Sequence, residues 1–330
     1  MSTTALRRSA TGGSSPRRDR EGREHIVAVS LIKEEQQGEG VPEDPAPPEP
    51  ESLMIASTAL TILAVLLLGF VVQLVFLSRI EHYRSQRLAY ADFRNELAQG
   101  TAPVGAVDNN GKQIKLGAPV ALLEIARIGM REVVAQGTTS GVLMNGPGHL
   151  RDTVMPGEAG VSVIMARRAA YGAPFARLSG LRVGDRISVT TGQGVQRFAV
   201  LDVRRAGDDA PAPPASNEGR LVLETATGSA YVPAGVLRVD AQLTSATVPS
   251  NGAVMSANEL PGNEKVLAGD SGAWLPIVLW AQALLVTAVG IVWARTRWGF
   301  WQAWLVGLPI LVAIALYIGD GIIRLLPNVT

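Results

Sequence analysis

The chain has 330 residues, 47% of them hydrophobic and 18% charged, with a formal net charge of +1. A near-neutral charge speaks against a nucleic-acid partner held by phosphate neutralisation. The absence of cysteine excludes disulfides, thiolate nucleophiles and metal sites built on sulfur, and three scattered histidines do not suggest a metal centre. We therefore expect no metal and no cofactor, and the apolar excess indicates a membrane protein with a soluble part.

Residues 1–52 have the composition of a disordered tail. The first part mixes Ser, Thr and Gly with arginines, and residues 34–51 are acidic and rich in proline. Neither part can bury enough apolar surface to offset the entropy of folding. We expect a disordered tail on the cytoplasmic side of the membrane.

Three apolar runs have the composition of membrane-spanning helices. They cover residues 53–78, 274–294 and 301–326, and tryptophans flank the second and third runs. A helix of about 20 apolar residues crosses the hydrocarbon core of about 30 Å, and tryptophan favours the interface. The sequence thus predicts three transmembrane helices. The expected partners are the membrane and, through the second and third helices, other membrane proteins.

The arrangement of basic residues bears on orientation. The loop at residues 295–300 carries Arg295 and Arg297, so the positive-inside rule places it in the cytoplasm and the region 79–273 outside. Arg79, Arg84 and Arg87, directly after the first apolar run, point to the opposite orientation. The charge evidence is divided, and we favour a multi-pass plasma-membrane protein with its soluble domain outside.

The soluble region contains three parts. Residues 79–102 are expected to form a helical stalk that ends near Gly100. Residues 103–248 show short apolar or alternating runs separated by Gly and Pro, the pattern of a closed or nearly closed β-barrel. One short helix is expected at residues 172–181, and a polar linker at 249–273. The predicted fold is mainly β: a barrel of about eight strands with one or two short helices, joined to three transmembrane helices.

Several motifs of this domain, in the same order, resemble the sortases of Gram-positive bacteria, and most closely their actinobacterial housekeeping (class E-like) branch. The resemblance covers about residues 119–245. It is carried by Gly146-Pro147-Gly148-His149, residues 155–160 (MPGEAG), residues 161–175 (VSVIMARRAAYGAPF), residues 181–185 (LRVGD) and residues 238–243 (RVDAQL). The resemblance implies a membrane-anchored β-barrel outside the cell, of a family that cleaves sorting signals of the Leu-Pro-x-Thr-Gly kind and joins them to a cell-wall amine.

The residues that carry sortase chemistry are changed in this chain. Sortases use a Cys after a strand that reads like Leu-x-x-Thr-Cys, a His acid/base and an Arg that steadies the oxyanion. By the resemblance these positions are Ala226, Arg167 and Arg238. A methyl group cannot attack a carbonyl, and a guanidinium does not exchange protons near neutrality. The sequence thus predicts a degenerate member in which no catalytic set is intact.

Two functions stay open at this point. The first is a pseudo-sortase that binds or scaffolds an extracytoplasmic peptide or a segment of an envelope protein. The second is an active transpeptidase or acyltransferase with a hydroxyl nucleophile, Thr225, Thr227 or Ser229. A hydroxyl needs an adjacent base, and His149 and Glu224 are the only candidates. Whether the chain is an enzyme is left open, and we favour the binding module.

Four charged residues are candidates for binding in the groove: Arg167, Arg168, Glu224 and Arg238. Glu224 shares a strand face with Ala226, because side chains repeat every two residues along a strand. It could pair with Arg167 or Arg238, or point outward into solvent. Positive charge left over after such pairing would suit a carboxylate, a phosphate or an acidic peptide segment.

Overall fold

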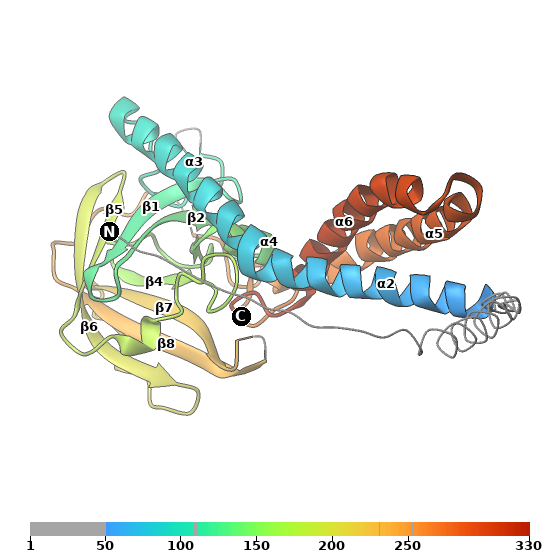
Figure 1. Cartoon of the computed structure of the whole chain (residues 1–330). Helices are drawn as coiled ribbons and strands as arrows, with labels where there is room; N and C mark the ends of the chain where they lie inside the picture. The colour runs from blue at the N-terminus through green and yellow to red at the C-terminus, as the bar shows by residue number, and fades with distance from the viewer. Residues whose placement is uncertain (1–50, 109–110, 231, 252–253) are drawn as a thin grey trace, which may run out of the picture. The chain divides into compact units, whose positions relative to one another are not determined.

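The computed structural model describes residues 51–108, 111–230, 232–251 and 254–330 (Figure 1). Residues 55–330 form one compact unit. A tail is predicted for residues 1–52, and its first 50 residues lie outside the described part of the chain.

Eight strands close into one barrel, which confirms the barrel part of the predicted fold class. Around the barrel the order is β1-β2-β3-β4-β7-β8-β6-β5, with two parallel pairs, β2 with β3 and β4 with β7. The strands are β1 (Pro119–Ile125), β2 (Met130–Gln136), β3 (Gly148–His149), β4 (Gly160–Met165), β5 (Arg186–Thr191), β6 (Gly194–Arg205), β7 (Gly219–Gly228) and β8 (Pro233–Leu243). The closure leaves no free sheet edge among these strands.

The inside of the barrel is filled by alternate residues of its strands. Leu221 and Leu223 of β7 point into the main core together with Leu237 and Val239 of β8. The intervening residues of β7 are also buried, on the outer face of the barrel. A strand buried on both faces needs cover from outside the barrel. On β7 that cover comes from parts of the chain that the sequence does not place there.

Short elements around the barrel differ from the sequence-based expectation. Helix α4 (Ser140–Asn145) was not predicted, whereas the helix expected at 172–181 is absent and only Leu178–Gly180 forms a 3-10 turn. The reason is the backbone at Ala170, Tyr171 and Ala173, where φ lies between +41° and +54°. Such left-handed residues cannot continue into a regular α-helix.

A long helical segment leads into the barrel domain. Helix α2 (Glu51–Val72) continues through a π-helical turn (Gln73–Leu77) into α3 (Ser78–Gln99), which Gly100 ends with a φ of +67°. Phe93 of α3 packs against Leu122 of β1 and Val133 of β2. The side chain of Gln86 also mimics a strand neighbour, because its Oε1 accepts from the Val133 N–H at 2.7 Å.

The predicted number of membrane spans is wrong by one. Among the described residues, two helices are long and apolar enough to cross a membrane: α5 (Trp274–Trp298), with the turn before it, and α6 (Phe300–Leu325). The apolar helical part of α2 is only Ala59–Val72, which is shorter than the about 20 residues that a span needs. A hydropathy count runs on through Gln73–Leu77, but the chain there is a π-helical turn.

Helices α5 and α6 form a hairpin whose two free ends lie together. Gly307 of α6 packs closely on Ile291 of α5, and Trp280 stacks on Tyr317 with ring centroids 5.0 Å apart. At the free ends, the Asp270 N–H donates to the Arg324 carbonyl at 2.9 Å. The segment before α5 and the segment after α6 therefore leave the hairpin at one and the same end.

Candidate peptide-binding groove beside strand β7

The candidate site lies on the outer face of the barrel, where β4, β7 and β8 run side by side. Ala226 is near the end of β7 and pairs across β8 with Val236. Glu224 lies two residues before Ala226 on β7, and it pairs with Arg238. The register therefore places all four side chains on one face of the sheet. Arg238 lies directly across from Glu224, and the apolar Val236 lies directly across from Ala226.

The charge of Arg238 is compensated within the sheet. Its Nε donates to Glu224 Oε1 at 2.5 Å, and the Glu224 side chain is buried while that of Arg238 is partly exposed. Two residues along β8, Asp240 forms a second ion pair with Arg204 of β6 at 2.6 Å. Of the two partners that the sequence left open for Glu224, the structure selects Arg238, and the outward solvated alternative does not apply.

Arg167 follows the end of β4 and is almost completely buried, at 1% exposure. Its Nη2 donates to the Ser140 carbonyl and its Nη1 to the Thr330 carbonyl, at 3.4 and 3.3 Å, while its Nε has no partner within the described part of the chain. The guanidinium also lies 5.7 Å from the centre of the Tyr171 ring. Burial lowers the pKa of Arg167 to about 10, so it stays protonated at neutral pH and offers no base.

We call the surface formed by Leu143, Met165 and Ala226 the groove. A distant segment of the chain, which contains Val329, fills it. The Val329 carbonyl accepts hydrogen bonds from the N–H groups of Arg168 and Ala226, at 3.1 and 3.4 Å, and lies 3.5 Å from the Thr225 hydroxyl. The Val329 side chain packs in one buried cluster with Leu143, Met165 and Ala226. No local sequence signal predicted this occupant.

A pocket of about 250 Å³ opens next to the filled part of the groove. Two arginines line it, Arg168 and Arg205, together with Thr225, Ala226 and Thr227, and none of its described lining residues is acidic. Arg168 also donates to the Gly228 carbonyl. Arg205, at the end of β6, was missed by the sequence analysis, since only the β6–β8 pairing brings it here.

The hydroxyl groups near Ala226 have no base beside them among the described residues. The Thr225 hydroxyl donates to the Ala166 carbonyl at 2.9 Å, and the Ser229 hydroxyl to the Val232 carbonyl at 3.2 Å. His149 is buried elsewhere, with Nε2 2.9 Å from the Val154 carbonyl and Nδ1 3.0 Å from Gln136 Oε1. Burial lowers its pKa to about 4, so the ring is neutral and both nitrogens are engaged.

The comparisons with known proteins agree with this barrel. Residues 123–238 match the family model of the sortase domain. This barrel is a sortase domain. The match confirms the family resemblance, and it spans the positions of Arg167, Ala226 and Arg238. None of the curated proteins compared with the chain matches it.

Solved sortase structures are similar to the chain at low identity. A sortase D5 transpeptidase from Clostridium perfringens is 24% identical, with a TM-score of 0.41, and the alignment covers 49% of this chain and 99% of that one. Sortase E from Streptomyces avermitilis is 27% identical, with a TM-score of 0.34 and coverage of 40% and 91%. A SrtF sortase from Corynebacterium diphtheriae is 24% identical, with a TM-score of 0.36 and coverage of 45% and 95%.

Proposed function

We propose that this chain is a membrane-anchored pseudo-sortase, whose sortase domain binds a peptide or a protein segment outside the cytoplasm without cutting it. The observation that carries the proposal is the contact at Ala226. A carbonyl group lies against Ala226 and accepts its backbone N–H, yet the side chain facing that region is a methyl group. The groove can hold a peptide group, but it supplies no nucleophile to attack it.

The remaining groups of the groove support binding rather than turnover. Arg167 stays protonated at neutral pH, and the Thr225 hydroxyl donates to a backbone carbonyl with no histidine of the described residues beside it. A hydroxyl nucleophile requires an adjacent base. The alternative of a hydroxyl-based transpeptidase therefore has no support in the contacts of Thr225 and Ser229.

The proposed location follows from the hairpin of α5 and α6. Its closed end carries Arg295 and Arg297, which the positive-inside rule places in the cytoplasm. Its open end joins the segments that contact the sortase domain, so the domain lies on the other side of the membrane. An extracytoplasmic domain of this kind suits a partner at the cell envelope.

Absence of cleavage is tested with purified full-length chain in detergent and a labelled sorting-signal peptide of the Leu-Pro-x-Thr-Gly kind. We expect no release of the C-terminal fragment above the rate in buffer. Ala226→Cys, which installs the only thiol of the chain, is the control for position, and intact-mass analysis reports any thioester it forms. Fragment release by the unmodified chain, abolished by Thr225→Val, would establish the hydroxyl enzyme instead.

A further inference from the structure

The occupant of the groove is a short segment that directly follows α6. Residues 326–330 read Leu-Pro-Asn-Val-Thr. They form a tight turn in which the Thr330 N–H and hydroxyl both donate to the Pro327 carbonyl, at 3.1 and 2.6 Å. Asn328, Val329 and Thr330 are all at most 2% exposed. Asn328 and Thr330 carry polar side chains, and such groups are buried only when specific partners replace their water.

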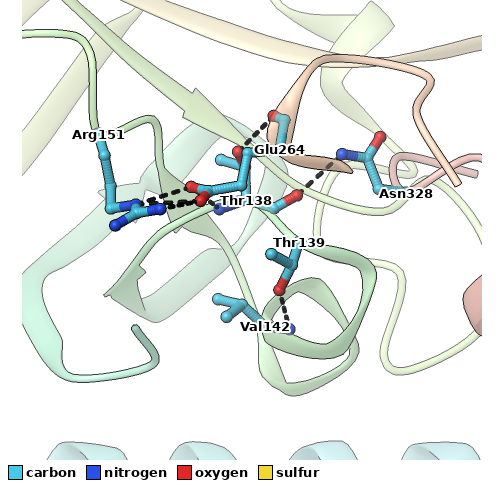
Figure 2. A network of polar contacts seen from close by, with 6 residues as sticks. All are labelled: Thr138, Thr139, Val142, Arg151, Glu264 and Asn328. Carbon is cyan, nitrogen blue, oxygen red and sulfur yellow. Dashed lines mark hydrogen bonds and ion pairs between the residues drawn. The ribbon is translucent and has the colours of Figure 1, made fainter. Parts of the chain in front are cut away.

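Asn328 fastens the segment to the barrel and to the linker before α5. Its Nδ2 donates to the carbonyls of Thr138 and Lys265, at 2.8 and 3.0 Å, and its N–H donates to the Ala268 carbonyl at 2.8 Å. Figure 2 shows the bond from Asn328 to Thr138, which lies next to the start of α4. Three hydrogen bonds thus position the residue that precedes Val329.

Val329 contacts the groove through both its carbonyl and its side chain. Its carbonyl receives the two N–H groups of Arg168 and Ala226, and its side chain enters an apolar pocket formed by Leu143, Met165 and Ala226. The next carbonyl, of Thr330, receives the buried guanidinium of Arg167. Without this segment Arg167 would keep only the Ser140 carbonyl as a protein acceptor, which burial makes costly.

We propose that residues 326–330 are a built-in peptide ligand of the groove, and that a free peptide with the same Pro-polar-Val-Thr pattern binds only when this segment withdraws. The inference rests on the proposed function and deepens it, because it names the ligand class and what controls access. The segment begins one residue after α6, so a shift of the α5–α6 hairpin in the membrane is transmitted directly to the groove.

Occupancy of the groove by residues 326–330 is tested by disulfide cross-linking. Because the chain has no native cysteine, only the introduced pair can form a disulfide within it. Full-length chain in nanodiscs carries Ala226→Cys with Val329→Cys, or Leu143→Cys with Val329→Cys as a second pair, and is treated with a mild oxidant. We expect a disulfide in both pairs, read by mass spectrometry of the digest. The control pair, Val183→Cys with Val329→Cys, should stay open, because Val183 is 71% exposed. Absence of a bond in both test pairs would overturn the proposal.

Access is tested with an N-terminally labelled Leu-Pro-Asn-Val-Thr peptide and fluorescence anisotropy. Val329→Asp in the full chain places a charge in the apolar cluster and should expel the segment. We expect it to bind the peptide about ten-fold or more tightly than the unmodified chain, because an occupied site raises the apparent Kd in proportion. Asn328→Ala, a milder change, should give a smaller gain. The surface change Val232→Asp is the matched control and should give none.

The possible results separate the two proposals. Equal binding to the unmodified and Val329→Asp chains would show a peptide site that the segment does not control, which refutes the inference alone. Absence of binding to every variant, with the cross-links formed and the thermal unfolding curves unchanged, would refute both the inference and the peptide-binding function. A peptide in which Val is replaced by Asp should not bind the opened groove, and its binding would refute the Val329 pocket as the recognition element.

Discussion

Chemistry at the residue scale depends on which polar groups are already engaged. Arg238 is neutralised by Glu224, Arg167 is buried between backbone carbonyls, and the Thr225 hydroxyl donates to the Ala166 carbonyl. Arg168 and Arg205 are the cations that line open space beside Ala226. An anionic group of a partner would therefore contact Arg168 and Arg205. It would not contact Arg167 and Arg238, which stand at the catalytic positions of the family.

The neutral His149 makes stability depend on pH. Its pKa is about 4 in the folded chain against 6.5 as the ordinary value, so the unfolded chain binds the extra proton first as the pH falls. Stability should be complete above about pH 6.5 and should fall by up to about 3 kcal/mol as the pH approaches 4. Thermal unfolding of the full chain, followed by circular dichroism between pH 4 and 7, measures this slope.

The control for this slope is His149→Gln. Burial raises the pKa of Glu158, whose titration acts in the opposite direction, so only the difference between the two chains isolates the histidine. The variant should be less stable at pH 7 but lose less on acidification. An identical loss in both chains would assign the pH dependence to other groups.

At the scale of elements, the segment between β8 and α5 is part of the folded domain rather than a free linker. Its residue Glu264 has a fully buried side chain that pairs with Arg151 through both carboxylate oxygens, and its carbonyl accepts the Thr138 hydroxyl at 2.6 Å (Figure 2). Thr139 caps α4 close by, through the Val142 N–H. This network supports the wall of the groove that holds Asn328.

Breaking the Arg151–Glu264 pair should open this wall. Glu264→Ala leaves Arg151 without its counter-ion while the arginine side chain is only 13% exposed, and removal of one partner of a buried pair costs about 3 kcal/mol. We expect a lower unfolding temperature and faster tryptic cleavage after Lys265. Glu259→Ala, at an exposed position of the same segment, should change neither. Equal cleavage rates in the two variants would contradict the structural role of the pair.

At the scale of the whole molecule, the α5–α6 hairpin and the barrel share contacts beyond the groove. Asp320 of α6 accepts hydrogen bonds from the Tyr171 hydroxyl, at 2.6 Å, and from Gln73 of the π-helical turn, at 3.1 Å. Tyr171 lies in the left-handed loop that follows Arg167 and Arg168. The loop that shapes one side of the groove is thus tied to both helical segments that flank the barrel in sequence.

Orientation in the membrane is the prediction at this scale. Single-cysteine variants are labelled in intact cells with a membrane-impermeant maleimide: Asp209→Cys in an exposed barrel loop, and Thr296→Cys near the closed end of the hairpin. We expect labelling of the first only, and of both after permeabilisation, because the arginines of the hairpin end hold it in the cytoplasm. Labelling of Thr296→Cys alone would invert the orientation and rule out a partner outside the cell.

The sequence by itself determined the β-barrel and the family of the domain, and it predicts that the nucleophile is lost. These rest on local information: strands marked by alternation and by Gly and Pro, motifs in a fixed order, and the identity of one residue, Ala226. Hydropathy also located the two helices of the C-terminal hairpin. It overcounted the spans because it measures composition and does not detect the π-helical turn at Gln73–Leu77.

Only the tertiary structure decided what surrounds Ala226. Register across β7 and β8 places Val236 opposite it and gives Arg238 to Glu224, and a single-residue slip would change both pairs. The occupant, Val329, comes from a segment 104 residues beyond Thr225 in the chain, and Glu264 meets Arg151 across 113 residues. Contacts at such separations leave no periodic trace in the sequence, because they arise when the barrel and the hairpin pack together.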